Sequence, residues 1–521
     1  MRGSSGPRID PVVERAPSLA PRGLLAVLAA VLGSISCIWT QLWPLALVAQ
    51  VPLLLGLRGL PARRAAGLGL LGGFVTHVIG FYWLGSAVVR FTGVPTAAAW
   101  ALAGLVLLFQ GGRQALAAWL FARAVERGWW QAPAFLAAFV TSELCYPQLF
   151  PSYYAMAAQG APLLMQTAEL GGPLLVSAVL ISANLAAAEL AAARIEGRQV
   201  QLAIVAIFAA IPAAAIVYGL VRMPMIDAQV ATSRPVQIGI VQGNQPVGGS
   251  EPASVALLRQ RLLTQELVGR GAELVIWSEG AVRPPLPERA YRRFLPDRVS
   301  SFLKVPAILG VEIFAQGARD QHRYNSVLAT DADGSVRSRY DKHLLVPFAE
   351  YVPLEPLLGP VVRQLSARPM LAAGPSLEPL TVVTDRPHRV TALICYEAIF
   401  AGFTRELVVR HQPELLVNLS NDAWFGDTVE PWEHLHLAQL RAVEHRRFLV
   451  RATNSGVSAI VDPVGRLRLQ GSVFRAEALR GEVRWMEPSA KTGYELLGDA
   501  PFVLVALAAL GMTLIGRRVR D

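Results

Sequence analysis

The sequence predicts two structural units: a polytopic α-helical membrane domain and an α/β domain that follows it. Three observations lead to this prediction. Residues 24–221 are dense in Leu, Ala, Val and Gly, residues 234–489 have the charged and polar mixture of a soluble domain, and residues 499–516 turn apolar again. With 53% hydrophobic residues over 521 positions, the chain is too apolar for a wholly soluble enzyme. We therefore expect a soluble-type domain held between membrane segments.

The apolar regions contain eight stretches that approach the length of about 20 residues needed to cross the hydrocarbon core of a bilayer. They cover residues 24–39, 43–57, 66–84, 96–122, 131–149, 172–193, 200–221 and 499–516. The second stretch is short, so the first two also fit a re-entrant hairpin. We expect a cytoplasmic arm over 1–22, a transmembrane domain of about seven helices over 23–222, and a C-terminal transmembrane helix over 499–516.

The placement of arginine predicts how these segments are oriented, because short cytoplasmic loops carry an excess of Lys and Arg. If the N-terminus is cytoplasmic, the outer loops between spans hold only Arg90 and the inner side holds the other loop arginines. The inner set comprises Arg58, Arg63, Arg64, Arg123, Arg127, Arg194, Arg198, Arg517, Arg518 and Arg520. Seven crossings then put residues 222–498 outside the cytoplasm. The same placement accounts for the net charge of +10 without nucleic acid as a partner.

Cysteine and histidine usage argues against disulfides and metals. The three cysteines, Cys37, Cys145 and Cys395, cannot build a disulfide framework, since two lie in the apolar region. Two of the eight histidines, His434 and His436, lie close together in "EHLHL", but no Cys or His pair has the spacing of zinc ligands. We expect solvated or capping roles for these two histidines, no metal and no cofactor.

In residues 234–489, short apolar runs alternate with helical periodicities. We expect strands over 236–242, 273–279, 305–314, 389–397 and 414–420, a hairpin over 448–470, and helices over 255–271, 402–411 and 432–447. Apolar strands separated by helices are typical of a layered α/β domain. In such sheets, reactive groups collect beyond the carboxyl ends of the strands.

Three residues with reactive side chains fall at such strand ends. Glu279 ends "ELVIWSE", Lys342 follows a hairpin strand in "RYDKHLLVPFAEYVP", and Cys395 lies near the end of "RVTALICYE". The lysine is informative because only three of the 48 basic residues are lysines, which indicates a need for a compact ammonium. Two interpretations stay open at this point. Cys395 is either a small core hydrophobe or a nucleophile, and Lys342 is either a surface salt-bridge partner or part of the site.

Four motifs occur in the order "WSEGA", "YDKHLLVPFAEYVP", "LICYEAIF" and "NLSNDAWFG". Together they resemble the Glu-Lys-Cys signatures of the nitrilase superfamily. With the apolar segments on both sides, residues 24–516 resemble the apolipoprotein N-acyltransferases, a membrane-embedded family of that superfamily. The resemblance implies a nitrilase-like αββα sandwich over 234–489 and a triad of Glu279, Lys342 and Cys395. Around the triad it implies Glu350 as a supporting carboxylate, and Tyr396 and Glu397 as residues that contact the substrate.

The chain departs from the family pattern at two places. Ala349 stands where the family usually has glycine, and "QGNQPVGGSEPAS" lacks the tryptophan that often follows "QGN" in the family. The first change costs little unless the backbone there needs a positive φ. The second removes one expected contact of a substrate loop.

The resemblance also implies a reaction. Cys395 would take an acyl chain from a membrane phospholipid as a thioester and pass it to the α-amino group of the diacylglyceryl cysteine of an apolipoprotein. Glu279 would be the general base, and Lys342 would stabilise the oxyanion with the backbone N–H of Tyr396. The family further implies a monomer without a cofactor, in the bacterial inner membrane, with its catalytic domain on the periplasmic side.

The stretch 347–376 is rich in Pro and Leu and unusually apolar for an exposed loop. We expect a mobile lip that admits lipid, with Trp424 and Phe425 lining the same entrance. The lip comprises Leu354, Leu357, Leu358 and Val361. The competing interpretation is that these residues only pack over the core of the domain.

Two other functions fit parts of the sequence. A membrane-tethered amidase of the nitrilase type would use the same triad with water as the acceptor, although eight crossings exceed what a tether needs. A transporter whose soluble domain only binds a ligand would be expected to carry inverted repeats and intramembrane charges. The predicted spans contain few such charges, among them Arg113 and Glu143. These two are candidates for a functional role, but snorkelling of one side chain and an interfacial position of the other explain them equally well.

Overall fold

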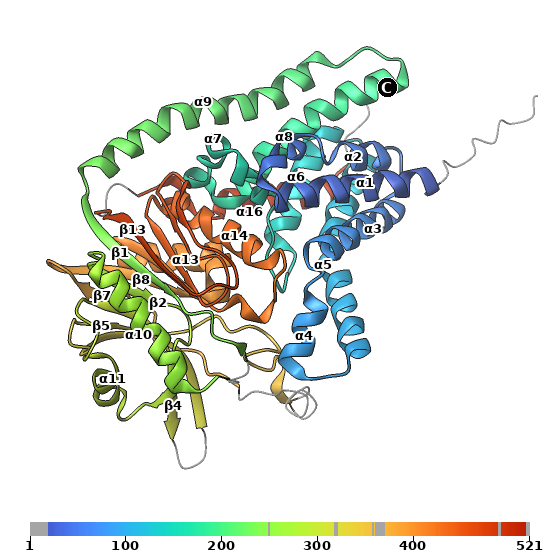
Figure 1. Cartoon of the computed structure of the whole chain (residues 1–521). Coiled ribbons are helices and arrows are strands. Elements are labelled where there is room, and N and C mark those ends of the chain that lie inside the picture. The colour runs from blue at the N-terminus through green and yellow to red at the C-terminus, as the bar shows by residue number, and fades with distance from the viewer. Residues whose placement is uncertain are drawn as a thin grey trace, which may run out of the picture.

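The structure is a computed structural model that describes residues 19–247, 251–316, 321–356, 359, 370–487 and 491–516. Its helical part, blue to green in Figure 1, lies across the top and right of the view, and the strands form layers at the lower left. The predicted arm over 1–22 lies mostly outside the described residues.

The N-terminal half is helical. Its elements are α1 Leu19–Ile38, η1 Thr40–Leu47, α2 Val51–Leu57, α3 Ala62–Gly80, α4 Leu84–Thr92, α5 Thr96–Glu126, α6 Gln131–Cys145, η2 Tyr154–Gly160, α7 Pro162–Met165, α8 Ala168–Glu196 and α9 Leu202–Thr232. Two further helices, α15 Gly493–Leu497 and α16 Ala500–Leu514, follow the strands. Five helical segments of the described chain are long and apolar enough to cross a membrane, and a bent pair makes a sixth.

The structure differs from the expected eight continuous spans. The stretch expected as one span over 66–84 is broken into α3 and α4, which are bent by 63°. The break brings Trp83, only 3% exposed, against other aromatic side chains, so packing overrides helical continuity. Helices α6 and α16 have 15 residues each, shorter than a straight crossing needs. The number of crossings therefore stays a prediction.

Close helix packing and buried polar contacts hold the bundle together. A Cβ on Gly73 would lie 2.3 Å from the carbonyl oxygen of Gly111, so α3 and α5 approach at a distance that only glycine allows. Arg113 and Glu143 form a buried ion pair of 2.9 Å between α5 and α6. Both side chains are buried among the helices and paired with each other.

Contacts between loops gather the arginine-rich ends of the helices at one end of the bundle. Arg58 pairs with Glu196 at 3.0 Å, and the backbone N–H of Ala62 donates to Glu126 at 2.7 Å. The indole of Trp129 donates to the carbonyl oxygen of Ile515 at 2.9 Å. The end predicted to face the cytoplasm is therefore one contiguous surface.

Two mixed sheets follow the helices. The first, in the order β13-β1-β2-β4-β5-β6 with β3 beside β4, contains β1 Arg234–Gln242, β2 Leu274–Trp277, β3 Val282–Pro287, β4 Ala307–Gln316, β5 Gln321–Thr330, β6 Val336–Asp341 and β13 Glu477–Trp485. The second, β12-β11-β10-β9-β8-β7, contains β7 Leu380–Val383, β8 Pro387–Ile394, β9 Leu415–Ser420, β10 Leu449–Thr453, β11 Ala459–Val461 and β12 Leu467–Gln470. All strands and helices expected from the periodicities are present, some shorter than predicted.

The sheets face each other across a core that includes Ile238 and Ile276 of one and Val417 of the other. Helices α10 Ala253–Gly269 and α11 Tyr291–Val299 cover the outer face of the first sheet, and α13 Ala401–His411 and α14 Glu430–His445 cover the second. The predicted αββα sandwich is therefore confirmed. Helix α14 also contacts α8, and a buried ion pair of 2.7 Å joins Arg446 to Glu169.

Candidate active site

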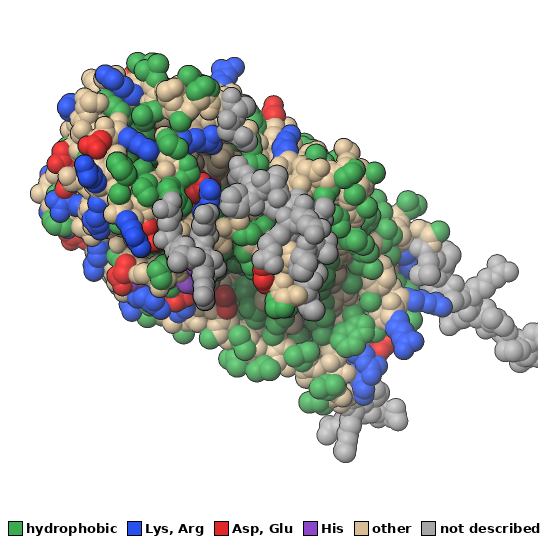
Figure 2. All heavy atoms as spheres, turned by 90° about the horizontal axis from the view of Figure 1, so that it is seen from below, with side chains coloured by type: hydrophobic (Ala, Val, Ile, Leu, Met, Phe, Trp, Pro, Cys, Tyr) green, Lys and Arg blue, Asp and Glu red, His purple; other side chains and the backbone are tan. Residues whose placement is uncertain are grey.

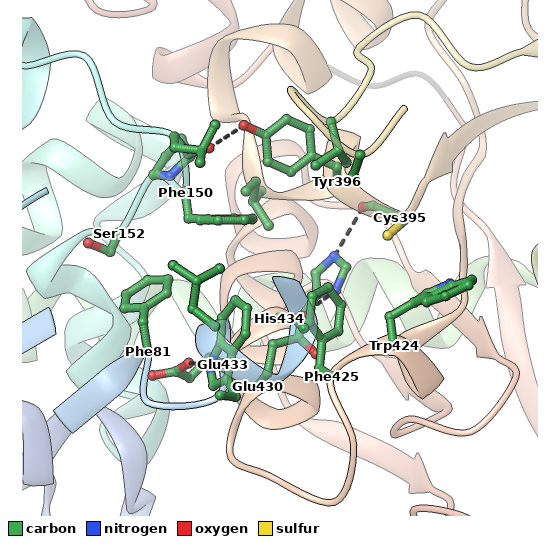
Figure 3. Close-up of a pocket in the computed structure, with 18 of the residues that line it drawn as sticks. Phe81, Phe150, Ser152, Cys395, Tyr396, Trp424, Phe425, Glu430, Glu433 and His434 are labelled. Carbon is green, nitrogen blue, oxygen red and sulfur yellow. Dashed lines mark hydrogen bonds and ion pairs between the residues drawn. The ribbon is translucent and has the colours of Figure 1, made fainter. Parts of the chain in front are cut away.

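Cys395 is the first residue after β8 and opens the short η4 helix, Cys395–Ile399. Its φ of +48° is uncommon for a residue other than glycine and marks a sharp turn. Hydrogen bonds hold the turn on both sides. The backbone N–H of Ile394 donates to Glu397 at 2.7 Å, and the Nε2 of His434 donates to the carbonyl oxygen of Cys395 at 3.0 Å (Figure 3).

Glu279 lies two residues beyond the end of β2 and lines the same cavity as Cys395. The side chain of Asn325, from β5, donates to its Oε1 at 2.6 Å, and its buried Oε2 has no hydrogen-bond partner among the described residues. Burial raises the pKa of Glu279, the charge of Lys342 lowers it, and Glu350 raises it further. A carboxylate with a raised pKa and one free oxygen is suited to accept a proton.

Lys342 directly follows β6 and is completely buried. Its Nζ lies 2.7 Å from the Oε1 of Glu350, whose Oε2 accepts the backbone N–H of Val346 at 2.8 Å. Burial alone would lower the pKa of Lys342, but Glu350, Cys395 and Glu279 together raise it above the usual lysine value. Lys342 is therefore a fixed positive charge close to both Cys395 and Glu279.

The surroundings of Cys395 favour the protonated thiol over the thiolate. Burial raises its pKa above the usual range and Glu279 raises it further, while Lys342 acts in the opposite direction. A nucleophilic role for this cysteine would therefore require a base that removes the thiol proton. The four residues expected from the motifs come together as a thiol, a base, a buried cation and the carboxylate that pairs with the cation.

Tyr396 faces the cavity, whereas its neighbour Glu397 does not. Tyr396 lines the cavity, and its hydroxyl donates to the carbonyl oxygen of Leu149 in the helical half. Glu397 is completely buried and does not line the cavity. Its Oε1 accepts the hydroxyl of Tyr340 at 2.8 Å and the backbone N–H of His343 at 2.6 Å. Glu397 therefore holds the turn at Cys395 to the loop after Lys342, rather than contacting substrate as expected.

Trp424 and Phe425 follow β9 and line the cavity where it meets α4. The ring of Trp424 stacks on Phe91 at 4.9 Å between centroids, and Phe425 contacts Trp83 edge-on at 4.9 Å. Of the expected lip, Leu354 is 69% exposed. Leu357, Leu358 and Val361 lie outside the described residues.

The cavity has a volume of about 1150 Å³ and extends from the sandwich into the helical bundle. Cys395 and Glu279 contribute to one part of its wall, while Ala26, Gly72 and Leu84 of α1, α3 and α4 contribute to another. Figure 2 shows charged side chains dense over one end of the molecule, hydrophobic side chains over much of the other, and a hollow between them. The reactive cysteine therefore lies in a space continuous with apolar helices.

Several residues of the site were not expected from the sequence. Asn325 had no motif to mark it, and the prediction of solvated or capping roles for His434 and His436 was wrong: their exposures are only 5% and 4%. Both histidines face inward because α14 is covered on one side by the sandwich and on the other by the helical half. The near-continuous burial of α14 could not be inferred from its polar composition.

Asp422, Glu430 and His434 each place a ligand-type atom within 4.8 Å of one another, which is the spacing of a metal site. Asp422 is already paired with the guanidinium of Arg451 at 2.8 Å. Because the positive charge of Arg451 disfavours a metal cation beside it, we interpret the group as an ionic cluster in which the Nδ1 of His434 lies 3.4 Å from Asp422 and 3.5 Å from Glu430. It supports the imidazole that bonds to the carbonyl of Cys395.

Comparison with known proteins follows the same division of the chain. Residues 23–186 match the model of the apolipoprotein N-acyltransferase N-terminal domain, and residues 237–479 match that of carbon-nitrogen hydrolases. An apolipoprotein N-acyltransferase of Azotobacter vinelandii is 32% identical over 96% of each chain. One from Pseudomonas paraeruginosa is 31% identical over 96% of this chain and 97% of that protein. The chain belongs to the apolipoprotein N-acyltransferase family.

Membership in this family makes the protein a membrane-embedded acyltransferase within the nitrilase superfamily. Among solved structures, an amidase of that superfamily from Nesterenkonia AN1 aligns with 52% of this chain and 97% of its own, at 17% identity and a TM-score of 0.36.

Proposed function

We propose that this acyltransferase moves an acyl chain from a membrane phospholipid to the α-amino group of the N-terminal diacylglyceryl cysteine of an apolipoprotein, through a thioester on Cys395. The observation that carries the proposal is the position of Cys395. Cys395 lies close to a base, Glu279, and to a buried cation, Lys342, in the wall of a cavity that continues among the apolar helices.

In the first step, Glu279 takes the thiol proton of Cys395 as the sulfur attacks the ester carbonyl of the phospholipid. Lys342 stabilises the oxyanion of the tetrahedral intermediate, together with the backbone N–H of Tyr396. When the intermediate collapses, the C–O ester bond breaks and Glu279 returns its proton to the leaving oxygen. The products are a lysophospholipid and a thioester on Cys395.

In the second step, the neutral amine of the acceptor attacks the thioester carbonyl. Glu279 takes a proton from the amine, the C–S bond breaks, and the thiolate of Cys395 recovers that proton. A thioester is a more reactive acyl donor towards an amine than an oxygen ester, so the intermediate favours amide formation. The raised pKa of the thiol makes the Cys395 thiolate a stronger nucleophile in the first step. In the second step the same thiolate is a poorer leaving group, so the proton that Glu279 transfers to the sulfur assists its departure.

Both substrates carry acyl chains in the bilayer, and moving them into water costs about 0.8 kcal/mol per CH₂ group. A cavity that reaches α1, α3 and α4 allows the chains to stay in apolar surroundings. We therefore propose a multi-pass monomer in the bacterial inner membrane, with a transmembrane domain over 23–222, the catalytic domain over 234–489 on the periplasmic side, and α16 as the last span. The arginine-rich end of the bundle supports this orientation.

The lip over 354–361 and the aromatic pair Trp424 and Phe425 are proposed as the route by which lipid reaches the cysteine. Polar substitution of Leu357 and Leu358 should slow acylation by phospholipid more than acylation by a short soluble ester. Equal losses with the two donors would show that the lip does not admit lipid.

Intact-protein mass spectrometry after incubation with phospholipid tests the thioester directly. We expect one acyl adduct, removed by hydroxylamine and lost in Cys395→Ala. Cys37→Ala and Cys145→Ala are matched controls that should retain it. An adduct that discharges equally fast with and without an amine acceptor would instead identify an amidase that uses water, and the absence of any adduct would reject the proposal.

A further inference from the structure

Glu433 is a buried carboxyl at the boundary between the two halves of the molecule. It lies in the first turn of α14, is 9% exposed and lines the cavity that contains Cys395. The indole N–H of Trp83 lies 3.4 Å from its Oε2, and a Cβ on Gly80 would lie 3.3 Å from its Oε1. The mechanism above does not use this group.

No Lys, Arg or His of the described chain forms an ion pair with Glu433. Buried charges in proteins are normally paired, because an unpaired one loses its hydration without compensation. The N–H of Trp83 and the start of α14 compensate only part of that loss. Without a counter-charge a buried carboxyl stays protonated, so an ionised Glu433 would require a cation from a ligand in the cavity.

The surroundings of Glu433 are aromatic. The ring of Trp83 lies 5.4 Å from Phe81, 5.7 Å from Phe150 and 4.9 Å from Phe425, between centroids. Figure 3 shows Phe81, Phe425 and Glu433 on the same side of the cavity. Aromatic faces attract cations within about 6 Å, and the attraction increases when water is excluded. A carboxylate within such a wall is chemically suited to an ammonium group.

We propose that Glu433, with Trp83 and the neighbouring phenylalanines, forms a subsite for a primary ammonium group carried by a lipid. The inference rests on the proposed function, because that reaction brings such groups into this cavity. Two sources share the chemistry: the α-ammonium of the diacylglyceryl acceptor and the aminoethyl head group of a phospholipid donor. In both, the ammonium is attached close to acylated glycerol.

The ionisation of Glu433 agrees with this geometry. Burial, and to a smaller extent Glu430, raise its pKa to about 8 against the opposing effect of the hydrogen bond from Trp83. A bound ammonium would favour the ionised carboxylate. The carboxyl can therefore release its proton when the cation arrives.

The test measures ligand binding to the full-length Cys395→Ala protein in detergent micelles, where no acyl transfer occurs. Two ligand pairs are compared, and in each pair N-acetylation removes the ammonium: phosphatidylethanolamine with its N-acetylated form of the same acyl chains, and a diacylglyceryl-cysteine peptide with its N-acetylated form. With Glu433 present, at least one pair should show a preference for the ammonium of about tenfold in Kd. The pair that shows the preference identifies the source.

Glu433→Gln keeps the size of the side chain and an acceptor for Trp83 but removes the charge. We expect it to reduce the preference below twofold while the ligands without an ammonium bind as before. Glu406→Gln, on the exposed face of α13, is the matched control and should retain the preference. A preference that survives in Glu433→Gln, or an equal loss for both members of each pair, would overturn the subsite.

The two proposals fail in different ways. The thioester is tested by adduct formation on Cys395, which does not depend on discrimination between head groups. The subsite is tested by binding without chemistry. If neither member of either pair binds to the Cys395→Ala protein, the proposed substrates are wrong and the subsite is rejected with them.

Discussion

Replacement of Glu350 by glutamine tests whether a buried ion pair keeps Lys342 charged for catalysis. Lys342 is 0% exposed, and the carboxylate of Glu350, 2.7 Å away, is only 16% exposed. Removing one partner of a buried pair costs about 3–5 kcal/mol when nothing replaces it. Glutamine still offers an oxygen, and Glu279 supplies a second negative charge, so we expect the loss to be roughly half of that, ~2 kcal/mol. Because the proposed role of Lys342 is to stabilise the oxyanion, we assign the same ~2 kcal/mol to the loss of transition-state stabilisation; at about 1.4 kcal/mol per tenfold change in rate, acylation should slow ~30-fold.

The same substitution should change the pH dependence of acylation. Lys342 has a raised pKa in the folded protein, so its charged form is present below that pKa and is lost as the pH rises through it. Without Glu350 the pKa falls, and the alkaline limb of the rate profile should move towards neutral pH. In the wild-type protein this limb should lie above the ordinary lysine range.

The assay is the initial rate of adduct formation on Cys395, followed by intact-protein mass spectrometry between pH 6 and 10. In this range the wild-type rate should show no alkaline fall, whereas the fall should enter the range in Glu350→Gln. Glu406→Gln is the control, because Glu406 pairs with Arg410 at 2.8 Å on an exposed helix face, where such pairs contribute little. If Glu350→Gln retained more than a third of the wild-type rate with an unchanged alkaline limb, the ion pair would not be what keeps Lys342 active.

Three further predictions follow from single contacts. Glu279→Gln should reduce acylation by about 10²–10⁴-fold. The variant should nevertheless melt at a higher temperature than the wild-type protein at pH 8, because burial raises the pKa of Glu279 and its ionised form therefore destabilises the folded state. The difference in melting temperature should shrink as the pH falls towards 4, and a lower melting temperature of the variant at pH 8 would contradict this. His434→Leu removes the N–H that donates to the carbonyl oxygen of Cys395. It should lower the acylation rate about tenfold without changing the KM for phospholipid, and His434→Gln should restore part of the rate. A change confined to KM would refute the positioning role of His434. Glu397→Gln should lower the free energy of unfolding by ~2 kcal/mol, because an amide cannot accept hydrogen bonds from all the N–H and O–H groups that donate to the carboxylate. Thermal denaturation measures this loss, and unchanged stability would show that these hydrogen bonds are dispensable.

The αββα sandwich and its reactive strand ends could be predicted because each buried strand carries its own signal. An apolar run such as "ALI" ends where the chain leaves the sheet, so Glu279, Lys342 and Cys395 mark sheet ends without any knowledge of their neighbours. The order of the motifs then identified the family, and the structure brings these residues together with Glu350. The apolar segments could be predicted in the same way, because an apolar stretch of about 20 residues indicates burial either in a bilayer or within the protein.

The contacts between distant segments could not be read in this way. The bend between α3 and α4, the burial of His434 and the position of Glu433 depend on how the helical half packs against α14. Trp83 and Glu433 are 350 residues apart in the chain, yet their side chains meet in the wall of one cavity. The sequence alone indicated the candidate reactive residues and the elements that carry them. Only the tertiary structure decided which polar groups are buried where the helical half meets the sandwich. Burial there depends on the surfaces of both halves, which no single segment of the sequence encodes.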